Sequence, residues 1–231
     1  MSRKGLVAML TCLAAFGAAA PSQALTREIG AEPAFPAASC PDNCQAVGRV
    51  SGFQVQQGEV ENPYRVRSDG HIVAFTIKLG DPNAEQIQFF NGLFGGPARA
   101  RLSILRRKPE GRRLPNRYRL LRHSDVFDLE PYFGSTPSFV LRRPLFVRRN
   151  DVLALTVPTW VPAFAVGLGQ DQTWRSSRTR GACDDVSQRS AHEMISSLQI
   201  YGCFYRTARL LYSATFVQKP RSTTDETRTS R

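Results

Sequence analysis

The amino-acid sequence predicts an all-β protein, a single β-sandwich of jelly-roll type. Between Gly48 and Val217, roughly eight to ten short segments alternate apolar with polar residues, which is the period of a strand with one buried face. Gly and Pro residues separate these segments, as turns between strands require. Helix signals are scarce: only Asp184–Ile195 could form a turn or two, and it has too few apolar residues for a core helix.

The N-terminus has the pattern of a secretory signal peptide. Arg3 and Lys4 give it a positive start, and the run Leu6–Ala20 that follows carries no charge. Small residues then precede a cleavage point expected after Ala24, so residues 1–24 are predicted to be removed and the protein to be secreted. Such a run spans only about 22 Å as a helix, short of the roughly 30 Å hydrocarbon core of a membrane. We therefore expect no transmembrane span after processing.

Beyond the signal peptide the chain divides into three predicted segments. Residues 25–39 contain Pro33 and Pro36 and are expected to form a linker. Residues 40–218 are expected to form the β-sandwich domain, and the polar residues 219–231 a disordered tail. The processed chain of 207 residues (231 − 24) is long enough to bury one substantial core, so one domain is the default.

Four cysteines remain after cleavage, and an even number in an exported protein indicates disulfides. Three pairings are possible, of which we favour Cys40–Cys44 and Cys183–Cys203. The first pair flanks a turn-forming Pro-Asp-Asn, and the second closes a loop worth roughly 3 kcal/mol in the chain-entropy model. Zinc coordination is the weaker alternative, because the second pair has neither a short spacing nor a histidine partner pattern.

The clearest strand of the first half is His71–Leu79, which follows the tight-turn pair Asp69-Gly70. Its alternation assigns one face to Val73, Phe75, Ile77 and Leu79 and the other to Ile72, Ala74, Thr76 and Lys78. Further strands are expected at Arg99–Leu105, Tyr118–Arg122 and Ser138–Leu141.

The second half continues the same pattern. Pro144–Val147 and Val152–Val157 are expected to be strands joined by a turn at residues 148–151. The second of these is nearly all apolar, so it is expected in the centre of a sheet. Phe164–Leu168 is another short strand, and Arg209–Val217 is expected to close the domain as one strand.

The formal net charge is +12, and loss of two basic residues with the signal peptide leaves +10 (12 − 2). Only four of the 31 basic residues are lysine, a bias that a high-GC genome produces by itself. An anionic partner would fit the charge. However, the arginines are scattered, and Arg99, Arg101, Arg117 and Arg119 alternate with apolar residues as on the solvated face of a strand. We therefore expect a solvated basic surface and no nucleic-acid partner.

No motif of catalysis or metal binding is complete, so no catalytic residue, metal or cofactor is predicted. His192-Glu193 begins like a zincin motif, but Ser196 occupies the place of the second ligand histidine. His123, Ser124 and Asp125 are adjacent on the chain, so they cannot form a catalytic relay. Asp184-Asp185 lacks the alternating oxygen ligands of an EF-hand calcium loop. The acids near possible strand ends, among which no spacing singles out a pair, are Glu59, Glu61, Asp125, Asp128 and Glu130.

Two tryptophans are the candidate ligand-binding residues. Trp160 lies on a proline-flanked connection after the apolar strand, and Trp174 lies in a polar, Arg-rich stretch. A flat aromatic ring on a loop can stack on a sugar, although packing at the end of the core is the alternative for Trp160. The aromatic residues Tyr201, Phe204 and Tyr205 are expected to pack on the disulfide of Cys203 rather than on a ligand.

Several segments together resemble secreted β-sandwich proteins of high-GC Gram-positive bacteria. They are Asp69–Val73, Phe139–Val147, Asn150–Leu155, the Trp160 loop, Tyr201–Cys203 and Ala208–Phe216. The resemblance covers most of the processed chain and is one of strands and turns. It implies the fold and export, and it transfers no functional residues, because that group has no assigned activity.

The leading hypothesis is therefore an exported, non-catalytic β-sandwich module that binds cell-envelope polysaccharide. Two alternatives stay open. A secreted hydrolase would need two acids that converge in a cleft, with the pKa of at least one carboxyl raised. A protein that binds an anionic polymer through arginine would need an asymmetric arginine patch and binding that weakens with salt.

Overall fold

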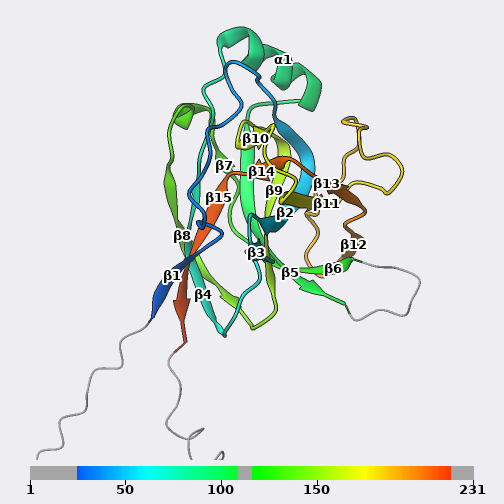
Figure 1. Cartoon of the computed structure of the whole chain (residues 1–231). Helices are drawn as coiled ribbons and strands as arrows, with labels where there is room; N and C mark the ends of the chain where they lie inside the picture. Colours follow the sequence, from blue (N-terminus) through cyan, green and yellow to red (C-terminus); the bar gives the residue numbers. More distant parts are fainter. Residues whose placement is uncertain (1–24, 109–115, 220–231) are drawn as a thin grey trace, which may run out of the picture.

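Figure 1 shows the computed structural model of the chain, which describes residues 25–108 and 116–219. The predicted signal peptide, residues 1–24, and residues 220–231 of the predicted tail lie outside the described residues. Lys219, the first residue of that predicted tail, belongs to the fold. Its backbone N–H donates a hydrogen bond to the Asp69 carbonyl at 3.1 Å.

The fold is mostly β, with 47% of residues in strands, which confirms the predicted all-β class. The described residues contain one α-helix, α1 (Ala84–Phe94), and one 3-10 turn, η1 (Glu130–Tyr132). The strands in chain order are β1 (Thr26–Ile29), β2 (Val47–Gln57), β3 (Val60–Glu61), β4 (Gly70–Ile77), β5 (Arg99–Arg107), β6 (Arg117–His123), β7 (Phe127–Asp128), β8 (Ser138–Val147), β9 (Val152–Val161), β10 (Phe164–Val166), β11 (Gln172–Ser176), β12 (Leu198–Ile200), β13 (Cys203–Tyr205), β14 (Ala208–Leu210) and β15 (Tyr212–Gln218).

The strands form curled antiparallel sheets. One sheet has the order β1-β15-β4-β8, and it lies on the left of Figure 1. A nine-stranded sheet has the order β12-β6-β5-β9-β2-β11-β13, with β3 paired to β2 and β7 paired to β5. Strands β10 and β14 form a separate two-stranded sheet. Because β1 pairs with β15, the first and last described strands lie side by side.

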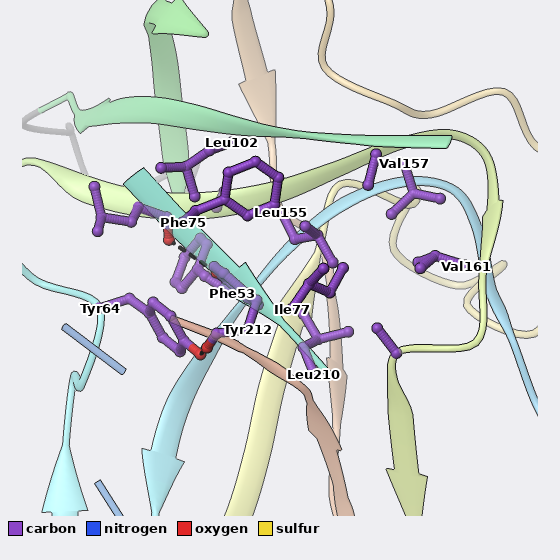
Figure 2. Packing of buried hydrophobic residues seen from close by; sticks show 14 of the residues in the cluster. Phe53, Tyr64, Phe75, Ile77, Leu102, Leu155, Val157, Val161, Leu210 and Tyr212 are labelled. Atoms are coloured by element: carbon purple, nitrogen blue, oxygen red, sulfur yellow. Dashed lines mark hydrogen bonds between the residues drawn. The ribbon is translucent and has the colours of Figure 1, made fainter. Parts of the chain in front are cut away.

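Side chains from both large sheets belong to one hydrophobic cluster, part of which Figure 2 shows. Tyr212 of β15 is fully buried in it and stacks on Tyr64, with ring centroids 4.3 Å apart. The Tyr212 hydroxyl donates to the backbone carbonyls of Leu153 at 3.1 Å and Gly52 at 3.3 Å, which belong to β9 and β2. The buried hydroxyl of Tyr212, which belongs to the four-stranded sheet, is therefore hydrogen-bonded to the backbone of the nine-stranded sheet.

Strand β4 confirms the predicted strand at residues 71–79, but a β-bulge changes which side chains are buried. The register shifts against β15, where Thr215 pairs with Ala74 and Phe216 pairs with Ile72, which leaves Val73 as the extra residue. A bulge interrupts the strict alternation of a strand. Ile72, predicted to lie on the opposite face from Phe75 and Ile77, is therefore fully buried together with them, and Val73 is only half-buried.

The predicted central strand is β9, which pairs with β2 on one side and β5 on the other. The predicted turn before it joins β8 and β9, which lie in different sheets. The strand predicted at Arg209–Val217 is divided in two. At Leu211 the chain leaves the pairing of β14 with β10, and β15 begins its pairing with β4.

Helix α1 is missing from the sequence predictions, although both of its ends have recognisable signals. Asn83 and Gln86 form a capping box, in which each side chain bonds the other's backbone N–H at 2.9 Å. Gly95 ends the helix with a φ of 77°. Conversely, Asp184–Ile195 contains no helix. Within the described residues, no helix is long and apolar enough to cross a membrane.

The segment 25–39, predicted as a linker, is part of the fold. It begins with β1, and the residues after β1 are fastened by Arg209, whose side chain is almost fully buried. The Arg209 guanidinium donates to the backbone carbonyls of Gly30 at 3.3 Å, Pro33 at 2.8 Å and Ala34 at 3.1 Å. Charged hydrogen bonds to backbone carbonyls fix this segment against the sheet, which its proline content alone did not indicate.

Both favoured disulfides are present. Cys40 bonds to Cys44 with a Cα–Cα distance of 3.9 Å, and Cys183 bonds to Cys203 with a Cα–Cα distance of 5.4 Å. The pairing excludes zinc coordination by these four thiols. It also ties the long loop after β11 to β13.

Candidate functional site

A pocket of about 460 Å³ lies where β10, β11, β13 and β14 meet the loop that follows β11. We call it the aromatic pocket. Its volume falls in the range of small-ligand sites, about 300–1,000 Å³. Apolar residues that line it are Val47, Phe164, Val166, Trp174 and Ala208. Polar residues that line it are Gln45, Arg178, Asp184, Tyr205, Arg206 and Thr207.

Trp174, one of the two predicted ligand-binding residues, lies in the wall of this pocket. It is directly opposite Tyr205 across the β11–β13 pair, and the two rings stack with centroids 4.4 Å apart. The ring of Phe164 packs against the indole in a T-shaped arrangement, with ring centroids 5.7 Å apart. Gly52 makes room for the indole, because a Cβ there would lie 2.9 Å from the ring. The Trp174 Nε1–H is buried and has no acceptor in the described part of the chain.

Arg178 is the buried cation of the pocket, with only 9% of its surface exposed. Its Nη1 donates to the carbonyl of Cys183 at 2.9 Å, and its Nη2 donates to that of Gly48 at 3.4 Å. Among the described residues, no acceptor meets its Nε–H. Backbone carbonyls thus hold the guanidinium in place, and it forms no direct ion pair with a described carboxylate.

The loop after β11 brings Asp184 and Val186 to the pocket. The disulfide from Cys183 to Cys203 holds this loop to β13, and the Tyr205 hydroxyl donates to the Cys183 carbonyl at 2.8 Å. The sequence predicted that Tyr205 packs on the disulfide rather than on a ligand. Its hydroxyl bonds the backbone of Cys183, and the residue also lines the pocket, which the sequence did not indicate. The aromatic wall and the loop are fastened to each other.

Trp160, the other predicted ligand-binding residue, belongs to the core. Its side chain has no exposed surface and packs against Phe90 at 4.9 Å and Phe133 at 5.6 Å between ring centroids. Its Nε1–H donates to Asn91 Oδ1 at 2.7 Å and is 3.1 Å from the Gly96 carbonyl. Helix α1 covers the end of β9, where Trp160 lies, and buries the indole. Neither face of the ring is therefore accessible to a ligand.

The five acids considered for hydrolysis have other partners or none. Asp125 pairs with Arg142 at 2.9 Å, and Asp128 pairs with Arg99 at 2.7 Å. Glu130 accepts from Asn91 and Ala98 near η1, while Glu59 and Glu61 are exposed at β3. The aromatic pocket is lined by one acidic residue only, Asp184, so no converging pair of acids is found there. In residues 25–108 and 116–219, no cluster of three or more His, Cys, Asp or Glu could hold a metal ion.

His192, from the incomplete zincin motif, is a buried structural residue. Its ring lies 2.9 Å from the Ser197 hydroxyl and 3.4 Å from the Tyr201 hydroxyl. Its backbone N–H donates to Ser51 at 2.9 Å. It therefore anchors the long loop to β2, and burial lowers the pKa of its imidazole below the usual range.

The lowered pKa of His192 predicts an acid-sensitive contribution to stability. The unfolded chain takes up a proton on this histidine near pH 6.5, while the folded chain resists it, so stability falls as pH falls below that value. The loss reaches at most about 1.4 kcal/mol per pH unit. Urea unfolding at pH 7.5 and pH 5 should show a larger loss for the wild type than for His192→Gln. Equal losses in the two proteins would contradict the assignment.

Comparisons of the chain with protein-family models, with curated proteins and with solved structures gave no match.

Proposed function

We propose that this chain is an exported, non-catalytic β-sandwich module of jelly-roll type that binds cell-envelope polysaccharide in the aromatic pocket. Export is supported by the predicted signal peptide and by two disulfides, which persist in oxidising compartments. The jelly-roll assignment is supported by two large antiparallel sheets that share one hydrophobic cluster. The resemblance to secreted β-sandwich proteins of high-GC Gram-positive bacteria agrees with both.

One observation carries the binding proposal: the stacked pair of Trp174 and Tyr205 lines the same pocket as the buried cation Arg178. Aromatic side chains present a broad apolar surface of the kind on which the C–H face of a sugar ring packs. Fixed N–H donors beside it suit hydroxyl or carboxylate oxygens. Arg206 adds a second cation at the exposed rim against the single carboxylate of Asp184, which favours neutral or acidic sugars over basic ones.

The pocket is also held rigid. Gln45 follows the disulfide cysteine Cys44, and Asp184 follows the disulfide cysteine Cys183, so a covalent link adjoins the pocket at two separate places. A preformed site loses less conformational entropy on binding than one that must be ordered by its ligand. The hydrolase alternative gains no such support, because a second carboxylate is missing from the residues that line this pocket.

Replacing Tyr205 with alanine is expected to weaken polysaccharide binding at least about tenfold, because it removes one of the two stacked rings in the wall of the pocket. The purified protein is first applied to an array of defined neutral and acidic cell-wall oligosaccharides. Isothermal titration calorimetry with a bound oligosaccharide then gives the affinity of the wild type and of Tyr205→Ala.

Phe204→Ala is the matched control. Phe204 is the neighbour of Tyr205 on β13, is 40% exposed and does not line the pocket, because adjacent side chains of a strand face opposite ways. The affinity of Phe204→Ala for the oligosaccharide should match that of the wild type. The proposal fails if no oligosaccharide binds, or if the two alanine variants lose affinity equally.

A further inference from the structure

A second pocket, of about 450 Å³, lies between β5, the segment that follows β6, and β8. It shares no lining residue with the aromatic pocket. Three arginines line it, Arg101, Arg142 and Arg143, together with a single acidic residue, Asp125. We call it the arginine pocket. The remaining lining residues are His123, Ser124 and Val126.

Arg101 is buried, whereas the sequence predicts that it lies on the solvated face of a strand. Only 8% of it is exposed, because Glu193 of the long loop lies against it. Its Nη2 donates to Glu193 Oε1 at 3.1 Å, while its Nε–H is buried and meets no acceptor in the described part of the chain. A desolvated cation with an unused donor gains more from an added anion than a hydrated one does.

Arg142 and Arg143 lie on β8 and are exposed. Asp125 accepts from Arg142 Nε at 2.9 Å, which orients that guanidinium and neutralises one charge. Arg143 forms no ion pair with any described residue. The lining residues therefore carry an excess of two positive charges (3 − 1), one of which, on Arg101, is paired with Glu193 from outside the lining.

The other polar groups of the arginine pocket shape its wall. The Ser124 hydroxyl accepts from the backbone N–H of Leu102 at 3.0 Å and donates to the Asp125 carbonyl at 2.7 Å. His123 Nδ1 lies 2.9 Å from the Ser124 carbonyl, which can only accept, so Nδ1 carries the proton of this bond. These bonds hold the segment that carries Asp125, and they leave recognition of a ligand to the arginines.

We propose that the arginine pocket binds the phosphoryl group of a phosphomonoester. A phosphomonoester carries a charge of about −1.5 to −2 at neutral pH, which is opposite in sign to the excess charge of the lining. Its oxygens also fit the planar fork of a guanidinium. The pocket is larger than inorganic phosphate requires, so the body of the ester occupies the remaining space. This inference is independent of the proposed function, since the two pockets have no residue in common.

Isothermal titration calorimetry tests it with glucose 6-phosphate, inorganic phosphate and glucuronate, and co-sedimentation tests it with vesicles that contain phosphatidic acid. At least one of the two esters should bind more tightly than inorganic phosphate and glucuronate. Which ester binds identifies the source as a sugar phosphate or a lipid headgroup. Arg143→Gln should weaken that binding at least about tenfold, because a charged hydrogen bond is lost.

Arg149→Gln is the matched control, because Arg149 is exposed, lies outside the pocket and loses the same charge. Arg149→Gln should change the affinity for the ester less than about twofold when salt screens the long-range electrostatic potential of the protein. Arg143 is exposed, so its replacement leaves the core intact, and circular dichroism verifies the fold. The inference is overturned if neither ester binds, if glucuronate binds as tightly as the ester, or if both variants weaken binding equally. Oligosaccharide binding by Arg143→Gln should equal that of the wild type, which separates the two sites.

Discussion

Trp160→Ala is expected to destabilise the protein by about 3–5 kcal/mol, the cost of removing a fully buried Trp side chain. Its indole packs between Phe90 and Phe133, so alanine would leave a cavity beneath α1. The substitution also leaves Asn91 Oδ1 and the Gly96 carbonyl without the donor that they share. A loss of this size is a large part of the 5–15 kcal/mol that a typical domain has.

Urea unfolding followed by circular dichroism measures this loss, since the chain has only two tryptophans and fluorescence would change with the substitution. Trp160→Phe is the control, because it keeps an aromatic ring against Phe90 and removes the N–H donor. It should cost clearly less than Trp160→Ala. If Trp160→Ala left the free energy of unfolding unchanged, Trp160 would not be part of the core and would again be a candidate for ligand contact.

The difference between the two tryptophans is not visible in their local sequences. Trp160 follows an apolar strand and Trp174 lies in a polar stretch, yet both side chains are buried. Trp160 is enclosed by α1, whose Asn91 is 69 residues away along the chain. Trp174 lines a pocket because β11 pairs with β13, which places Tyr205 opposite it. Only long-range contacts separate a core residue from a site residue here, so sequence reasoning could name both but not distinguish them.

Local patterns predicted several of the strands, among them β4, β5, β6 and β9, because alternation and turn residues act over a few positions. The bulge at Val73 shows the limit of that reasoning, since an unpaired residue depends on the partner strand. Arg101 shows the same limit for charge. Its place in an alternating strand predicts solvent exposure, but Glu193, 92 residues later, covers it. Arg178 gave no signal at all, because its burial depends on the carbonyls of Gly48 and Cys183.

The Cys183–Cys203 disulfide is expected to contribute about 3 kcal/mol to stability, since it closes a loop with a sequence separation of 20. Replacing both cysteines with alanine removes that restraint on the unfolded chain. The same chain-entropy reasoning gives about 2 kcal/mol for Cys40–Cys44, whose separation is only 4. Urea unfolding should therefore show that the variant without Cys183–Cys203 is less stable than the variant without Cys40–Cys44.

The Cys183–Cys203 variant should also lose oligosaccharide binding under conditions where it remains folded. The bond fixes the Cys183 carbonyl, which accepts hydrogen bonds from both Arg178 and Tyr205, and it holds Asp184 beside them. Without it, the loop can move away from β13, and ligand binding must then supply the order that the disulfide supplied before. Full affinity in a folded Cys183→Ala, Cys203→Ala variant would mean that hydrogen bonds and packing alone shape the aromatic pocket.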